Sequence, residues 1–122
     1  MKFLTVIRAR EDLGPPPPAL MMAIGQLGME AAAAGVLVTS GGLMPTKTAS
    51  MARVSRGKLT VTDGPFPEAK EVIGGFAIYE LPSREEAVRW MNRFMEIHRD
   101  LWPGYEGEAE IREVFEGPPP GM

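Results

Sequence analysis

The sequence predicts an α+β domain in which an antiparallel sheet is covered on one face by two helices. Short runs rich in β-branched and aromatic residues alternate with two longer segments of helical spacing. The 122 residues, of which 44% are hydrophobic and 24% charged, have the size and composition of one globular domain. The chain has no cysteine, so its core cannot depend on disulfides.

The first part of the chain is expected to form a strand, a helix and a second strand. Residues 2–9 (KFLTVIRA) are rich in strand formers, and the prolines that follow end the strand because they donate no backbone hydrogen bond. A helix is expected from Pro18, which suits a first helical turn, to Ala34, since Gly35 is a typical helix stop. Residues 36–40 are expected to be a buried strand. The methionines of this helix and of the helix near the end of the chain are expected to form an adaptable part of the core, with a binding groove as the alternative; they are Met21, Met22, Met29, Met91 and Met95.

The middle of the chain is expected to form a hairpin and a further strand. The segment SMARVSRGKLTVTDG alternates polar and apolar residues around Arg56 and Gly57, which is typical of a tight turn between two short strands. Residues 75–81 (GFAIYEL) are the next expected strand, and Pro82 closes it.

The last part of the chain contains the clearest helix. Ser83 and Glu86 have the spacing of a capping box at its start, and a Pro-Gly pair stops it after Trp102. A final strand is expected over residues 109–115. The order of elements corresponds to a ferredoxin-like split βαβ fold with a hairpin inserted at its middle. Residues 1–116 are predicted to form this single domain, and residues 117–122 a flexible tail rich in proline and glycine.

Both faces of the predicted sheet are apolar. In the first strand, Leu4 and Val6 point to one side while Phe3 and Ile7 point to the other, and the strand at 75–81 has the same double pattern. Because two helices cover only one face, we expect a second copy to cover the other, which gives a homodimer through the sheet face. The alternative is that these residues are ordinary exposed apolar side chains.

Charge and motif content exclude several functions. The net charge is −3 and no long basic run is present, so nucleic-acid binding is not expected. No segment has the ~20 apolar residues of a membrane span, and the expected location is the cytoplasm. With one histidine, no cysteine and no Gly-rich nucleotide-binding pattern, neither a metal nor a cofactor is expected.

The segment 60–76, TVTDGPFPEAKEVIGGF, combines turn formers, charges and a glycine pair between two apolar runs. Asp63-Gly64-Pro65 is a turn signal. Gly74 and Gly75 open a strand, which indicates a bulge or the close approach of another backbone or a ligand. The segment is therefore either an elaborate bend or a reactive site.

The pattern DGPFPEAKEVIGGF, with AGVLVTSGGLMPT upstream and EIREVFE downstream, resembles the DGPF-domain branch of the YCII-related family. The resemblance spans nearly the whole chain and implies a ferredoxin-like fold of the dimeric α/β-barrel type. It implies less about activity, although some members of this branch are encoded beside, or fused to, extracytoplasmic-function sigma factors. Related proteins carry a His–Asp pair proposed as an acid/base site, and this sequence departs from that pattern. Its single histidine, His98, lies late in the second helix, and Arg8, Arg10, Glu11 and Asp12 follow or end the first strand.

Three charged residues are the main candidates for a site. Asp63 is the best acid/base candidate, since a carboxylate at a strand end facing a semi-apolar dimer cavity would have a raised pKa. The alternative is that it only caps its own turn. Arg112 is a candidate clamp for an anionic substrate, and Arg8 is a second one. The alternative for Arg112 is a salt bridge with Asp63, Glu68 or Glu110.

Two further residues have both a functional and a structural interpretation, and a third has only a structural one. Tyr79 either presents its hydroxyl to a cavity or is a core tyrosine. Glu68 is either a binding residue or part of a solvated loop pair with Lys70. His98 is expected to be packed near the end of its helix.

Two functional hypotheses from different classes follow. The first is a homodimeric, cofactor-free module that binds a small anionic or phenolic ligand or acts as an accessory protein, in a transcription-linked context by resemblance alone. The second is a small cofactor-independent enzyme of the lyase or isomerase type, with Asp63 as acid/base and Arg112 or Arg8 holding the substrate charge.

Overall fold

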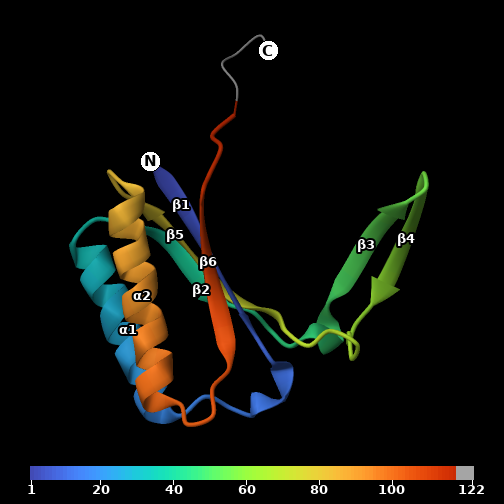
Figure 1. The fold of residues 1–122 in the computed structure, drawn as a ribbon, viewed down its shortest axis with the longest axis horizontal. Coiled ribbons are helices and arrows are strands. Elements are labelled where there is room, and N and C mark those ends of the chain that lie inside the picture. Colours follow the sequence, from blue (N-terminus) through green and yellow to red (C-terminus); the bar gives the residue numbers. More distant parts are fainter. Residues whose placement is uncertain (118–122) are drawn as a thin grey trace.

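The computed structural model describes residues 1–117 and shows a sheet with two helices on one side and a separate hairpin (Figure 1). The strands are β1 (Lys2–Ala9), β2 (Leu37–Gly42), β3 (Ser50–Ser55), β4 (Lys58–Asp63), β5 (Val72–Glu80) and β6 (Gly107–Glu113). The helices are α1 (Pro18–Ala33) and α2 (Arg84–Leu101), with short 3-10 turns η1 (Glu11–Leu13) and η2 (Thr46–Thr48). Of the predicted tail, only Gly117 lies within the described residues.

The sheet has the order β2-β5-β1-β6 with all neighbours antiparallel, and β3 and β4 pair only with each other. This is the strand order of a ferredoxin-like split βαβ fold, with the hairpin inserted between β2 and β5. The predicted fold class is confirmed. Within residues 1–117, no helix is long and apolar enough to span a membrane.

The glycine pair at the start of β5 makes a bulge. Ile7 pairs with Gly75, while the next residue of β1, Arg8, pairs with Ile73, so Gly74 is the extra residue. A Cβ at position 75 would lie 3.1 Å from the carbonyl oxygen of Gly41 on β2, so the backbones approach closely there. β5 therefore begins at Val72 rather than at the predicted residue 75, because the bulge lets the strand continue through the glycines.

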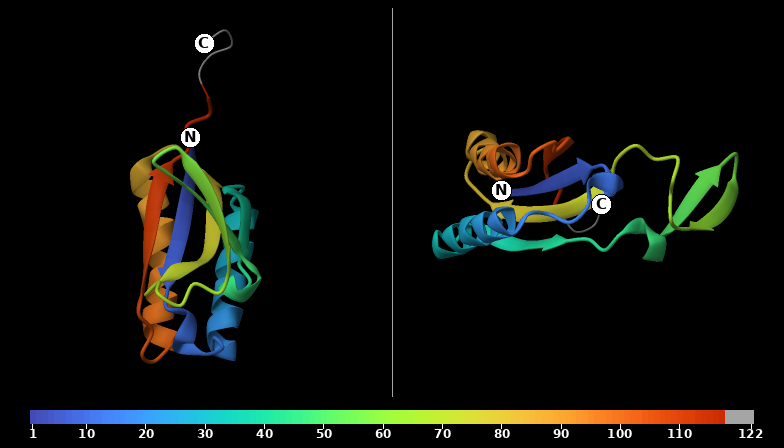
Figure 2. Two further views of the ribbon diagram at one scale, coloured as in Figure 1. Left: turned by 90° about the vertical axis from the view of Figure 1, so that its right-hand side faces the viewer. Right: turned by 90° about the horizontal axis from the view of Figure 1, so that it is seen from below.

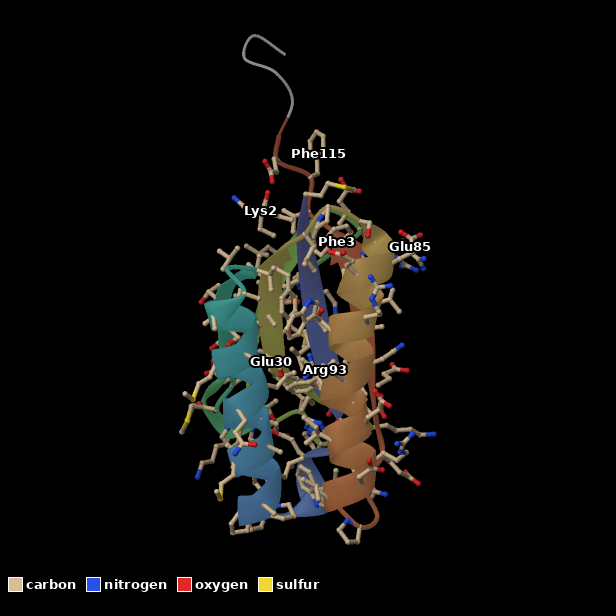
Figure 3. All side chains as sticks on the ribbon, turned by 90° about the vertical axis from the view of Figure 1, so that its left-hand side faces the viewer. Lys2, Phe3, Glu30, Glu85, Arg93 and Phe115 are labelled. Carbon is tan, nitrogen blue, oxygen red and sulfur yellow. The ribbon has the colours of Figure 1, made fainter. Side chains whose placement is uncertain are left out.

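Both helices begin as the sequence predicts. Pro18 occupies the first turn of α1, and the Ser83 hydroxyl accepts a 3.2 Å hydrogen bond from the backbone N–H of Glu86 at the start of α2. The two helices lie side by side in Figure 3, where the Arg93 guanidinium donates to the Glu30 carboxylate at 3.0 Å and links α2 to α1. The same guanidinium lies 5.0 Å from the centre of the Trp90 ring.

The core lies between the sheet and the helices. Phe3, Tyr79, Ala31 and Ala87 are buried there and pack together. The prediction for the methionines of α1 was wrong, because Met21, Met22 and Met29 are 53%, 68% and 74% exposed. The inward side of this helix is occupied by Leu20, Leu27 and Ala31 at helical spacing, which leaves the methionines on the outer side.

The other face of the sheet is not covered by any element of the described chain (Figure 1). Its centre is an apolar stripe made by Leu4 and Val6 of β1 and by Phe76 and Ile78 of β5, which pair across the two strands. These four side chains are only half-buried. The prediction of two apolar sheet faces is confirmed.

The β3–β4 hairpin projects away from the body and stands opposite this uncovered face. Seen from that side, it lies in front of the sheet (Figure 2). Arg56 and Gly57 both have positive φ, at 52° and 76°, as a tight two-residue hairpin turn requires. Every residue of both strands is exposed. The turn was correctly predicted, but a freestanding hairpin was not.

Candidate functional site

The root of the hairpin, residues 46–50 and 63–66, is hydrogen-bonded through Thr46 to Glu11 of η1, the turn that follows β1. The Glu11 carboxylate accepts hydrogen bonds from the backbone N–H and the hydroxyl of Thr46, both at 2.6 Å. These two bonds hold the pKa of Glu11 below its usual value. Thr46 is buried, and its hydroxyl also accepts a 3.5 Å bond from the N–H of Phe66. The hairpin therefore has a defined anchor on η1, next to the sheet.

Gly64 fills the tightest point of this root. Its N–H donates to the carbonyl of Ala49 at 2.7 Å. A Cβ at this position would lie 2.7 Å from the carbonyl carbon of Thr46 and still closer to its oxygen, so no side chain fits. The segment with Asp63, Gly64 and Phe66 is thus a bend that closes the hairpin and anchors it.

Asp63 is the last residue of β4 and is exposed. Its carboxylate accepts a 2.8 Å hydrogen bond from the hydroxyl of Ser50, which is its partner across the hairpin. It does not bond to the residue two positions on, because that residue is Pro65, which has no N–H. No arginine or lysine of residues 1–117 lies within 4.0 Å of it, so the structure does not join Asp63 to Arg112.

The two candidate arginines meet on the uncovered face. Arg8 donates to Glu110 at 2.9 Å, and the Nε of Arg112 lies 3.8 Å from the other oxygen of the same carboxylate. All three project from the face that carries the apolar stripe, since Arg112 pairs with Leu4 and Glu110 with Val6. Asp63, Glu68 and Glu110 were the predicted partners of Arg112, and in the structure Arg112 lies beside Glu110.

Tyr79 and Glu68 lie apart from this cluster. Tyr79 points to the helix side, where it is buried and its ring centre lies 6.0 Å from that of Trp90. Burial raises the pKa of its hydroxyl. This is the core tyrosine of the structural interpretation. Glu68 is exposed in the loop between the hairpin and β5.

His98 is packed among aromatic rings near the end of α2, as expected. Its ring centre lies 4.5 Å from that of Phe94 and 4.8 Å from that of Tyr105, and its Nδ1 is 2.9 Å from the carbonyl oxygen of Phe94. Burial lowers its pKa because the charged imidazolium loses water. This histidine belongs to the helix layer, on the opposite side of the sheet from the arginines.

The position of His98 predicts a pH dependence of stability. In the unfolded chain the imidazole takes up a proton below about pH 6.5, whereas in the folded chain its lowered pKa resists this. The free energy of unfolding should therefore be constant above about pH 6.5 and should decrease as the pH falls below it. His98→Gln should lose this slope between about pH 7 and pH 5.5, measured by urea unfolding. Because the chain has one histidine, an unchanged slope would contradict the prediction.

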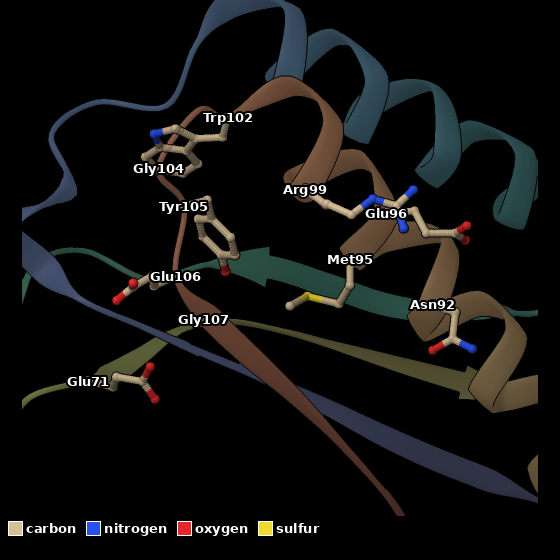
Figure 4. Close-up of a pocket in the computed structure, with 10 residues that line it drawn as sticks. All are labelled: Glu71, Asn92, Met95, Glu96, Arg99, Trp102, Gly104, Tyr105, Glu106 and Gly107. Atoms are coloured by element: carbon tan, nitrogen blue, oxygen red, sulfur yellow. The ribbon is translucent and has the colours of Figure 1, made fainter.

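An open groove of about 850 Å³ lies between α2 and the start of β6, and it was not predicted from the sequence (Figure 4). It is lined by Glu71, Asn92, Met95, Glu96, Arg99, Trp102, Gly104, Tyr105, Glu106 and Gly107. Burial and the nearby charge of Glu71 raise the pKa of Tyr105. The only indication in the sequence was that two aromatic residues, Trp102 and Tyr105, flank the Pro-Gly pair that ends α2. None of the predicted site residues lines this groove.

In the described part of the chain, no three His, Asp or Glu side chains come together as metal ligands.

The fold and the site define an α+β domain with one uncovered sheet face and an anchored hairpin. The YCII-related domain matches residues 1–116, and the chain belongs to this family.

Two further comparisons describe its neighbours. No curated protein matches the chain. A similar solved structure is 5-chloro-2-hydroxyhydroquinone dehydrochlorinase (TftG) from Burkholderia phenoliruptrix AC1100 in complex with 2,5-dihydroxybenzoquinone. It has a TM-score of 0.43 and 16% sequence identity, and the alignment covers 96% of each chain.

Proposed function

We propose that this protein is a homodimeric, cofactor-free binding module of the YCII-related family. The uncovered sheet face closes on a second copy, and a small anionic or phenolic ligand binds in the space enclosed beside Arg8 and Arg112. One observation carries the proposal: an apolar stripe and an arginine cluster share the sheet face that residues 1–117 leave uncovered.

The apolar stripe supports the dimer. Antiparallel sheets that face water are usually polar on that side, whereas Leu4, Val6, Phe76 and Ile78 form a continuous apolar centre here. Removing such surface from water stabilises an interface by roughly 25 cal/mol per Å². The charged residues around the stripe are balanced in sign, with Lys2, Arg8 and Arg112 against Glu80, Glu108 and Glu110. The face therefore meets its own copy without net repulsion.

The arginine cluster supports the ligand class. Two guanidinium groups, each with five N–H donors, share the one carboxylate of Glu110, and the contact of Arg112 at 3.8 Å is loose. Donors therefore stay available to a second anion, and the adjacent stripe suits an aromatic ring. A small aromatic carboxylate or a phenolate combines both features.

Asp63 separates this proposal from the enzymatic alternative. A lyase or isomerase of the kind considered would need its carboxylate beside the arginines that hold the substrate. Within one protomer Asp63 instead bonds to Ser50 at the hairpin root. The binding module is therefore favoured. The transcription-linked context and the cytoplasmic location belong to this proposal as expectations from the sequence.

The ligand site is tested by thermal shift with benzoate, salicylate, succinate and catechol. At about 100 Kd a ligand stabilises the folded protein by about 2.7 kcal/mol, which raises Tm by several degrees. At least one compound should do so with the wild type, Arg112→Ala should abolish the shift, and Glu110→Gln should enlarge it by freeing both guanidinium groups.

Arg89→Ala is the matched control. Arg89 is 68% exposed and lies 3.7 Å from Glu86, whereas Arg112 is 78% exposed and lies 3.8 Å from Glu110. The ligand shift should survive in this variant. The ligand site would be refuted if no compound raised the Tm of the wild type. It would also be refuted if Arg112→Ala and Arg89→Ala reduced the ligand-induced rise in Tm equally. A wild type that sediments as a monomer at micromolar concentration would refute the dimer.

A further inference from the structure

The β3–β4 hairpin has one apolar and one mixed polar face. Residues directly opposite each other in an antiparallel pair share a face, and alternate pairs share the same one. Ala52 pairs with Val61 and Val54 with Leu59, so these four side chains make one face of the hairpin. The opposite face carries Met51, Arg53, Ser55, Lys58, Thr60 and Thr62.

Nothing in residues 1–117 covers the apolar face. Val54, Leu59 and Val61 are 72%, 64% and 66% exposed. An isolated two-stranded hairpin is at best marginally stable in water and needs a surface to pack on. A contiguous apolar face at this place therefore indicates a contact with another molecule.

The position of the hairpin points to what that molecule is. The hydrogen bonds between Glu11 and Thr46 fix its root to η1, the turn that follows β1, and it stands opposite the uncovered sheet face (Figures 1 and 2). A molecule that covers the apolar stripe of that face therefore occupies the space next to the hairpin as well. A second copy of the chain suits both surfaces, because it brings an equally apolar stripe and a face of balanced charge.

We propose that the apolar face of the hairpin packs on the second copy, so that each protomer clasps the other. This inference rests on the homodimer proposed above and names the segment that secures it. Asp63 and Ser50 form the next alternate pair on the same face as Val61 and Ala52. Asp63 and Ser50 therefore lie on the face of the hairpin that packs on the second copy.

The first test compares two threonine variants of the full chain by sedimentation over a dilution series. Threonine is β-branched and favours the strand conformation, so both variants retain strand propensity. Leu59→Thr on the apolar face should raise the dimer Kd at least about tenfold, because two such contacts are lost per dimer. Met51→Thr, on the opposite face of the same hairpin, is the matched control and should change it less than about threefold.

The second test identifies the occupant directly. A photo-crosslinking amino acid replaces Leu59, and isotopically heavy and light chains are mixed before irradiation. Peptides that join a heavy chain to a light chain would support the clasp. Crosslinks confined to one chain would show that the hairpin folds back on its own sheet and would overturn it.

The two proposals fail in different ways. A wild type that is dimeric, with Leu59→Thr equally dimeric and no heavy–light crosslinks, leaves the homodimer intact and refutes only the clasp. A monomeric wild type refutes both.

Discussion

Gly64→Ala is expected to lower the melting temperature by roughly 10 °C, which corresponds to a loss of about 3 kcal/mol in a domain of this size. The added methyl group would lie 2.7 Å from the carbonyl carbon of Thr46 and closer still to its oxygen. Since this obstacle is backbone, it cannot rotate away as a side chain would. The hairpin root must open, and the bond from the Gly64 N–H to Ala49 is lost with it.

The control for this variant is Gly74→Ala, at the bulge of β5. A Cβ at Gly74 would meet no atom within 4 Å, so its Tm should change by less than about 2 °C. Hydrogen exchange at the amides of residues 50–63 distinguishes local opening of the hairpin from loss of the whole fold. A Gly64→Ala protein with wild-type Tm and wild-type exchange would contradict the anchor.

Gly107→Ala is expected to destabilise the protein by about 2 kcal/mol and to disturb the aromatic cluster at the end of α2. A Cβ here would lie 2.8 Å from the carbonyl oxygen of Arg8 and would collide with the Tyr105 ring, 2.7 Å from its Cζ. The ring can shift but the strand backbone cannot move freely. Because Tyr105 contacts both His98 and Trp102, with ring centres at 4.8 Å and 5.2 Å, the shift reaches the buried histidine.

Calorimetry and the near-ultraviolet circular dichroism of Trp102 and Tyr105 measure this effect. Gly28→Ala is the matched control, because its Cβ would meet nothing within 4 Å and alanine is the better helix former. It should be neutral or stabilising by up to about 1 kcal/mol. An unchanged aromatic spectrum in Gly107→Ala would show that the groove tolerates a side chain there.

Local signals predicted most of the secondary structure. β1 matches its expected bounds, because strand formers run up to a proline segment that cannot continue the ladder. The Arg56-Gly57 turn and the Ser83 cap were also predicted, since each depends on residues within a few positions of one another. The methionines of α1 were misplaced, because an apolar helix with little polar contrast does not show which side faces the core.

The contacts that build the site could not be predicted in this way. Glu11 and Thr46 are 35 residues apart, and Arg8 and Glu110 are 102 residues apart. No local pattern indicates that Glu11 receives two hydrogen bonds or that the two arginines share one carboxylate. Asp63 was recognised as part of a turn, but its bond to Ser50 depends on the register of a hairpin that only the folded chain fixes.

By itself, the sequence determined the order of strands and helices, the turn of the hairpin and the apolar character of both sheet faces. These properties follow from the periodicity of side chains and from the conformational limits of proline and glycine, which act over a few residues. The tertiary structure alone decided that the hairpin stands free, that the backbone of Gly64 closes its root and that Arg8, Arg112 and Glu110 meet on the uncovered face. Such contacts depend on strand register and on close packing between segments far apart in the chain, which no local residue pattern specifies.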